Sequence, residues 1–137
     1  MSAVAVRGRL LLVDDDESVR ETTAALLADD FDVVTAPDGP RALDLLAQQG
    51  FDVICADYGM PGMTGVELLR RAQAVRPLAC ILVTGHREYV SEIGADMRHG
   101  IAVVLKPYEP QMLIDTVQRS YLLRKAQGMS QPQRKAL

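Results

Sequence analysis

The feature that most constrains the fold of this chain is the alternation of short apolar runs with helix-length segments. Several runs are nearly continuous in valine, isoleucine and leucine, which is typical of strands buried on both faces of a parallel sheet. The runs are RLLLVD (9–14), FDVVTA (31–36), FDVICAD (51–57), ACILVT (79–84) and IAVVL (101–105). The segments that follow them carry apolar residues at helical spacing, and they predict helices over residues 17–29, 38–49, 65–75, 88–98 and 110–126. Five strand–helix units predict a single α/β domain, (βα)5, with a doubly wound parallel sheet, because right-handed crossovers place helices on both faces.

Local signals set the limits of the helices and of the domain. Asp38-Gly-Pro predicts a helix start with proline in the first turn, and Gly50 predicts the end of that helix. The last residues, QGMSQPQRKAL, lose the apolar period and are interpreted as a tail or linker. We therefore expect an N-terminal extension at 1–7, one domain at 8–126 and a tail at 127–137.

Composition excludes several classes of protein. The net charge of −3 argues that this domain does not itself bind nucleic acid, since such a face normally leaves a basic footprint. No apolar run approaches the roughly 18–20 residues of a membrane span, and the N-terminus is a poor signal peptide, so a cytoplasmic protein is expected. Cys55 and Cys80 each lie in an apolar run and are interpreted as small buried hydrophobic residues.

Polar residues follow four of the predicted strands at the point where each strand ends. Because parallel strands bring their carboxyl ends to one edge of the sheet, these residues are expected to share a crevice. Asp16 and Glu17 have a simpler interpretation as the cap and first turn of a helix, which favours acidic residues. The strand-end residues are Asp14-Asp15-Asp16, Asp57, Thr84 and Lys106-Pro107.

Such a cluster restricts the chemistry of the site. Two carboxylates about 4 Å apart repel by roughly 4 kcal/mol at an effective dielectric constant near 20, so they must protonate, separate or hold a cation. Oxygen ligands without cysteine or histidine select Mg²⁺, Mn²⁺ or Ca²⁺ rather than zinc. A carboxylate can also accept a phosphoryl group, with a hydroxyl and an ammonium group to contact its oxygens. The pattern predicts a site that moves a phosphoryl group onto an aspartate.

Together these motifs resemble the receiver domain of bacterial two-component response regulators, the CheY-like family. The resemblance covers roughly residues 8–126 and is carried by LLVDDDESVR, DVICADYGMPGMTGVELLRR, ILVTGH and VVLKPYEP, in this order. It implies a flavodoxin-like sheet with strand order 2-1-3-4-5. It also implies a phosphoacceptor that takes its phosphoryl group from a sensor histidine kinase or a histidine phosphotransfer protein and signals to a downstream protein.

The resemblance also assigns the metal and phosphoacceptor residues. Asp57 matches the phosphorylated aspartate. Asp15 matches the acid that binds Mg²⁺ directly, with Mn²⁺ as an alternative ion, and Asp14 matches its partner, which usually acts through water. Gly59 lies where a backbone carbonyl completes the metal shell.

The remaining assignments concern the switch. Thr84 matches the hydroxyl that turns toward the phosphoryl group and Lys106 matches the family lysine, followed by a peptide bond to Pro107 that the family holds cis. The face built from residues 88–126 is expected to change when Asp57 is phosphorylated.

Two positions depart from the family pattern and bear on that switch. Gly85 follows Thr84 where the family usually has a small residue such as alanine. Val103 stands where the family often has tyrosine or phenylalanine, and it cannot make an aromatic rotamer change. Gly85 and His86 are expected to make the loop after Thr84 more mobile, and Tyr89 is a candidate for the moving aromatic ring. The simpler interpretation of His86 and Tyr89 is ordinary loop and helix surface.

Two other classes of function remain open from the sequence. A haloacid-dehalogenase-type phosphohydrolase would use Asp14 as nucleophile and Asp16 as acid and base, but the acids past Lys106, Glu109 and Asp115, have the wrong spacing for its second acidic pair. The second class is a binding module, either a flavodoxin-like FMN carrier or a phosphate-independent receiver. The FMN carrier would need a loop after the first strand that does not repel phosphate, and the phosphate-independent receiver would normally lack part of the site. The main expectation is therefore a phosphoacceptor without turnover of a separate substrate. Sequence leaves open whether two copies pair.

Overall fold

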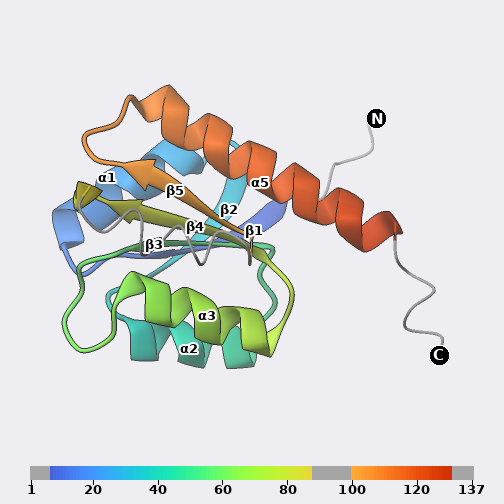
Figure 1. The fold of residues 1–137 in the computed structure, drawn as a ribbon, viewed down its shortest axis with the longest axis horizontal. Coiled ribbons are helices and arrows are strands. Elements are labelled where there is room, and N and C mark those ends of the chain that lie inside the picture. The colour runs from blue at the N-terminus through green and yellow to red at the C-terminus, as the bar shows by residue number, and fades with distance from the viewer. Residues whose placement is uncertain (1–6, 88–99, 131–137) are drawn as a thin grey trace.

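The computed structural model describes residues 7–87 and 100–130 of the chain. They form a parallel five-stranded sheet in the order β2-β1-β3-β4-β5, with helices on both faces (Figure 1). The strands are β1 (Gly8–Val13), β2 (Phe31–Ala36), β3 (Val53–Asp57), β4 (Ala79–Thr84) and β5 (Ile101–Leu105). The helices are α1 (Glu17–Leu27), α2 (Gly39–Gln48), α3 (Gly65–Val75) and α5 (Pro110–Ser130). The α/β class, the parallel sheet and the predicted strand order are confirmed; the helix expected over 88–98 lies outside the described residues.

Strand alternation divides the core into two layers. One face of the sheet packs against α2 and α3, and the other face packs against α1 and α5. Strands β1, β3 and β4 are almost wholly buried, as their apolar sequences predict. The edge strands differ from that prediction, because β2 and β5 expose part of their length and only their inward residues are buried.

The helix ends follow local sequence signals. Asp16 caps α1 by accepting a hydrogen bond from the Val19 N–H at 3.0 Å, and Asp38 caps α2 through the Arg41 N–H at 2.8 Å. Helix α5 runs to residue 130, four residues past its predicted end, and its last turns project beyond the sheet (Figure 1). Gln127 and Gly128 are exposed, and the segment QGMS carries no apolar period, so the sequence pattern gives no sign of this extension.

The two cysteines are free and buried, as predicted. Cys55 packs in the layer under α1 and α5, whereas Cys80 packs in the layer under α2 and α3, so the sheet separates the two thiols. Among the helices of the described residues, none is long and apolar enough to cross a membrane.

Candidate functional site

The carboxyl ends of four strands lie next to one another at one edge of the sheet. Strands β1 and β3 pair in parallel up to the residues directly before Asp14 and Asp57. Strand β4 ends at Thr84, and the Lys106 N–H just after β5 donates to the Thr84 carbonyl oxygen at 2.8 Å. The sheet therefore brings the polar residues that follow these strands to a common edge, as the sequence predicted.

Three carboxylates gather at this edge. One oxygen each from Asp14, Asp15 and Asp57 lies within 4.8 Å of the others. Their burial differs: Asp14 is 7% exposed, Asp57 is partly buried and Asp15 is exposed. Such a group of oxygen ligands, without sulfur or nitrogen, suits a hard divalent cation.

Backbone and side-chain contacts hold Asp14 in place. Its Oδ1 accepts a hydrogen bond from the Asp16 N–H at 2.9 Å, and its carbonyl oxygen accepts one from Arg20 Nη1 at 2.8 Å. Burial raises the pKa of the Asp14 carboxyl above its ordinary value of 3.8, and the negative charge of Asp57 raises this pKa further. The hydrogen bond from Asp16 opposes these two effects without cancelling them. Asp14 is thus a carboxylate whose charge is poorly compensated by the protein alone.

Lys106 is the cation of the site. Its Nζ lies 2.7 Å from Asp57 Oδ1, and the side chains of Lys106 and Asp57 are 36% and 13% exposed. Burial alone would lower the Lys106 pKa, but the hydrogen bond and the charge of Asp57 outweigh burial and raise it. The peptide bond to Pro107 is cis, as the resemblance implied. Lys106 is therefore charged and directed at Asp57.

Thr84 and Gly59 lie near Asp57 but contact it less directly than Lys106 does. Thr84 is 1% exposed, and its hydroxyl oxygen accepts a hydrogen bond from the His86 N–H at 2.9 Å. Within residues 7–87 and 100–130, it makes no hydrogen bond with Asp57. A Cβ added to Gly59 would lie 3.9 Å from Asp57 Oδ2, so this glycine is close to the carboxylate. The structure thus brings both residues near the acid, but their roles stay predictions.

Gly65 fixes the loop that leaves Asp57. Its N–H donates to the Tyr58 carbonyl oxygen at 2.9 Å. A Cβ at this position would lie 2.4 Å from the Asp57 carbonyl oxygen and 2.8 Å from Leu82 Cδ1. Only glycine allows the first turn of α3 to approach the end of β3 so closely.

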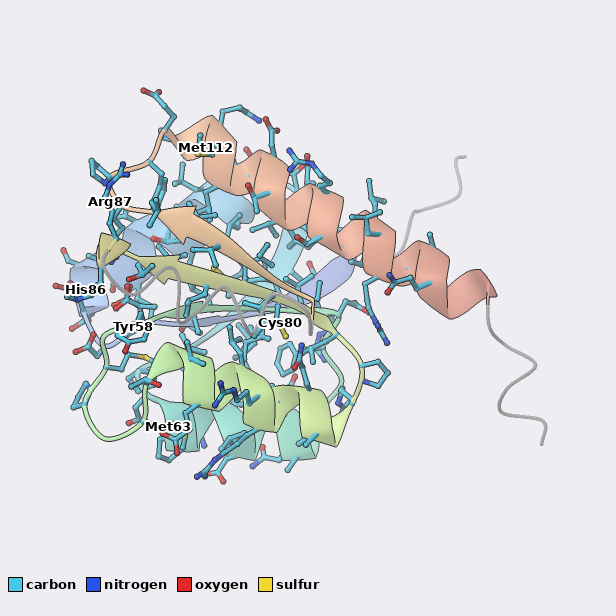
Figure 2. The ribbon with its side chains drawn as sticks, viewed as in Figure 1. Tyr58, Met63, Cys80, His86, Arg87 and Met112 are labelled. Carbon is cyan, nitrogen blue, oxygen red and sulfur yellow. The ribbon has the colours of Figure 1, made fainter. Side chains whose placement is uncertain are left out.

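Sequence reasoning missed an aromatic contact beside the site. The rings of Tyr58 and His86 meet edge to face, with centroids 5.8 Å apart and planes at 60°. Both labels lie at the same end of the sheet in Figure 2. Tyr58 directly follows Asp57 and His86 lies two residues after Thr84, but nothing in their separation along the chain indicates that they touch. Tyr89, the other aromatic candidate, lies outside the described residues.

A small interior space lies beneath the carboxylates. Its volume is about 10 Å³, and its lining includes Thr23, Cys55 and Tyr108 together with Asp14 and Lys106. A space this small is at the lower limit for one water molecule. The floor of the site is therefore closely packed, and it supports the acids without room for a ligand.

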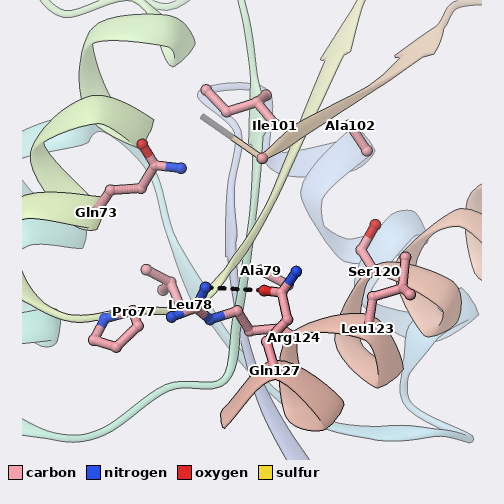
Figure 3. Close-up of a pocket in the computed structure, with 11 residues that line it drawn as sticks. Gln73, Pro77, Leu78, Ala79, Ile101, Ala102, Ser120, Leu123, Arg124 and Gln127 are labelled. Atoms are coloured by element: carbon pink, nitrogen blue, oxygen red, sulfur yellow. Dashed lines mark hydrogen bonds between the residues drawn. The ribbon is translucent and has the colours of Figure 1, made fainter. Parts of the chain in front are cut away.

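A larger cavity lies at the other end of the sheet. It measures about 560 Å³ and is bordered by the end of α3, the start of β5 and the second half of α5 (Figure 3). Leu78, Ile101 and Leu123 contribute apolar surface, and Arg124 contributes a charge. Since no carboxylate is among the described residues that line it, this cavity is separate from the acidic site.

The comparisons with known proteins agree with this geometry. The response regulator receiver domain family matches residues 10–118. The chain belongs to this family. The chemotaxis protein CheY of Pseudomonas aeruginosa is 31% identical to the receiver domain described here over 118 residues, which is 82% of this chain and 95% of CheY.

Other relatives are longer proteins. The hydrogenase transcriptional regulatory protein HoxA of Cupriavidus necator is 33% identical over 121 residues, or 87% of this chain, but the match spans only 25% of HoxA. A receiver domain protein of solved structure from Clostridium thermocellum superposes with a TM-score of 0.79 at 25% identity, covering 87% of this chain and 98% of that one. The receiver domain thus occurs alone in CheY and as a part of HoxA.

The donor set of this receiver domain fits a magnesium ion. The three carboxylates offer hard oxygens within reach of one another, and burial raises the pKa of Asp14, so the protein alone compensates the charge of this acid poorly. The alternative phosphohydrolase finds no support in the geometry, because Glu109 and Asp115 do not join the acidic cluster in the described part of the chain. An FMN carrier is disfavoured too, since three carboxylates would repel the phosphate of the flavin.

Proposed function

We propose that this receiver domain accepts a phosphoryl group on Asp57 in a two-component phosphorelay. The observation that carries the proposal is the double environment of Asp57. Its carboxylate lies 2.7 Å from the Lys106 ammonium group and also has an oxygen within 4.8 Å of oxygens from two further carboxylates. An acid that is held by a cation and also shares a cation-binding cluster is arranged for phosphoryl transfer rather than for stability alone.

The reaction is a displacement at phosphorus. An Asp57 oxygen forms a bond to the phosphorus of a donor phosphohistidine, the bond from phosphorus to the imidazole nitrogen breaks, and the imidazole leaves with the electron pair and takes up a proton. Lys106 lies beside Asp57 Oδ1 and neutralises charge on the transferred oxygens. Water later attacks the acyl phosphate slowly, so the domain turns over no separate substrate.

Asp14, Asp15 and Asp57, with the backbone carbonyl of Gly59, are the proposed holders of Mg²⁺, with Mn²⁺ as the alternative. A bound divalent ion neutralises the phosphoryl oxygens and relieves the repulsion among the carboxylates. Asp14 is preorganised for this role by the hydrogen bonds to its Oδ1 and its carbonyl oxygen. Asp15, as the exposed acid of the three, lies on the side open to solvent.

The proposed partners follow from the chemistry. A sensor histidine kinase or a histidine phosphotransfer protein supplies the phosphoryl group, and a downstream protein reads the face formed by residues 88–126. Thr84 contributes its hydroxyl to the phosphoryl group, which shifts an equilibrium between two states of that face. Part of the face, 88–99, lies outside the described residues. Pairing of two copies is a further outcome that phosphorylation could control.

The test is phosphorylation of the purified chain with acetyl phosphate, followed by intact-mass measurement. With Mg²⁺ present, we expect the mass of one added phosphoryl group, and with a chelator in place of Mg²⁺ we expect little or none. The variant Asp57→Asn should remain unmodified. The matched control is Asp16→Asn, which changes a neighbouring acid that caps α1 and should still accept the group. Equal labelling of the Asp57→Asn protein would refute the proposal.

A further inference from the structure

The ring contact between Tyr58 and His86 links the two loops that carry the phosphoacceptor and the buried threonine. Tyr58 is held from both sides, because its N–H donates to the Val83 carbonyl at 2.8 Å and its carbonyl accepts from Gly65 at 2.9 Å. Its backbone is therefore fixed next to Asp57, and its side chain is partly buried against the core layer under α2 and α3. The His86 ring rests on the Tyr58 ring with centroids 5.8 Å apart.

His86 is also attached to Thr84. The His86 N–H donates to the Thr84 hydroxyl oxygen at 2.9 Å. A rotation of the Thr84 side chain toward a phosphoryl group on Asp57 would carry this oxygen away from the His86 N–H. In the unphosphorylated protein, the hydrogen bond to Thr84 therefore fixes the backbone of His86, and the ring contact with Tyr58 fixes its side chain.

Gly85 lets His86 respond to such a rotation. A Cβ at position 85 would meet only Lys106 Cβ, at 3.8 Å, which is an ordinary contact. Space therefore does not require glycine at this position. What glycine adds is backbone freedom between Thr84 and His86, and His86 itself is exposed, so its ring can leave Tyr58 without disturbing the core.

We propose that His86 is a positioning residue for Thr84, and that phosphorylation of Asp57 separates the His86 ring from Tyr58. This inference rests on the proposed phosphorylation of Asp57 and adds the route by which the site reaches the surface. In the resting protein, the ring contact holds His86 and thereby holds the Thr84 hydroxyl. When Thr84 turns toward the phosphoryl oxygens, the His86 N–H loses its acceptor, Gly85 yields, and the histidine ring moves off the tyrosine.

The first test follows the side-chain protons of His86 by NMR in the full chain, with beryllofluoride and Mg²⁺ as the phosphoryl analogue. We expect the ring current of Tyr58 to shift these resonances in the free protein, and the variant Tyr58→Leu gives their position without the ring. We expect addition of beryllofluoride to move the wild-type resonances toward the Tyr58→Leu position. The backbone amide of Asp57 reports binding of the analogue independently.

Two outcomes separate this inference from the proposed function. If the Asp57 amide shifts and the His86 resonances keep their displacement, the ring contact survives activation and the inference is wrong while phosphorylation stands. If the Asp57 amide does not shift either, both proposals fall. The Asp57→Asn protein should show neither change.

A second test measures the affinity for beryllofluoride. Because the ring contact favours the resting state, Tyr58→Leu should bind the analogue about two- to tenfold more tightly, which is the range expected for one aromatic pair. Tyr58→Phe keeps a ring and should stay within about twofold of wild type. Gly85→Ala, which fits sterically, should weaken binding by restricting the loop. Affinities of Tyr58→Leu and Tyr58→Phe that are equal to that of wild type would overturn the inference.

Discussion

Lys106 Nζ lies 2.7 Å from Asp57 Oδ1, so one ion pair joins the first residue after β5 to the last residue of β3. The two strands are not neighbours, since β4 lies between them in the sheet. The lysine therefore reaches across the end of β4, where Thr84 is located, to contact the acid. Asp57 therefore contacts a cation and also belongs to the group of three carboxylates.

Removal of the lysine charge should slow phosphorylation strongly. In the Lys106→Met protein we expect the rate of phosphorylation by acetyl phosphate to fall by about 10² to 10³, the loss typical of one electrostatic group aimed at developing charge. Lys106→Arg keeps the charge with a different geometry and should lose less. The measurement is the time course of intact mass at saturating Mg²⁺. An unchanged rate in Lys106→Met would show that the ion pair is only structural.

Removal of the buried acid should stabilise the protein when no divalent cation is present. The Asp14 pKa is raised in the folded state, so the stability linked to this group is full below pH 3.8 and is lost as pH rises through the folded pKa. At pH 7 the ionised carboxylate therefore destabilises the fold. We expect Asp14→Asn to unfold at a higher temperature than wild type in the presence of a chelator.

Addition of Mg²⁺ should make wild type more stable to heat than Asp14→Asn. Wild type should gain thermal stability on addition of Mg²⁺, because the ion binds only the folded state, whereas Asp14→Asn should gain less. Asp44→Asn, a change of an exposed acid on α2, serves as the control and should follow wild type with and without the ion. A destabilised Asp14→Asn protein in chelator would contradict the account of Asp14.

Gly65 lies so close to the Asp57 carbonyl oxygen that its replacement by alanine should destabilise the protein. Gly65→Ala places a Cβ against the Asp57 carbonyl oxygen at 2.4 Å, so the start of α3 or the end of β3 must move. We expect the free energy of unfolding to fall by about 1–3 kcal/mol, as in overpacked cores, and phosphorylation to slow as well. Gly59→Ala is the matched control, because its Cβ meets only Asp57 Oδ2 at 3.9 Å. Denaturant titrations that place the two variants at equal stability would count against this geometry.

Because the two thiols are buried, we expect the folded protein to lose stability in alkali. Burial raises the pKa of Cys55 and of Cys80 from 9.0 to about 12. The unfolded chain therefore releases these protons first, and stability falls as pH rises from 9 toward 12, by at most about 1.4 kcal/mol per pH unit for each thiol. A Cys55→Ala, Cys80→Ala double variant should show a shallower decline. Rapid labelling of the wild-type thiols by a thiol reagent at pH 8 would contradict their burial.

The fold could be predicted from the sequence because its signals are local and mutually consistent. Apolar runs mark the strands, acids and glycines mark the helix ends, and the strand-end residues need only a parallel sheet to meet. Asp14, Asp15, Asp57 and Lys106 come together for that reason. The sequence did not predict the last four residues of α5, because they carry no apolar period and include Gly128, a poor helix former.

Other features depend on tertiary contacts that the sequence does not encode locally. The contact between Tyr58 and His86 joins two loops that are separated by α3 and β4. The partial exposure of β2 and β5 depends on their position at the sheet edges, which strand composition alone does not reveal. The hydrogen bond that the His86 N–H donates to the Thr84 hydroxyl oxygen likewise depends on the side-chain rotamer of Thr84.

The most direct test of the central claim is to identify which aspartate carries the phosphoryl group. The chain is phosphorylated with acetyl phosphate and Mg²⁺ and then reduced with borohydride, which converts the aspartyl phosphate to homoserine, and the residue is located by peptide sequencing. If Asp57 is the phosphoacceptor, homoserine is expected at position 57. Homoserine at position 14 would instead indicate the phosphohydrolase-type nucleophile, and homoserine at position 14 or 15, or at none, would contradict the account.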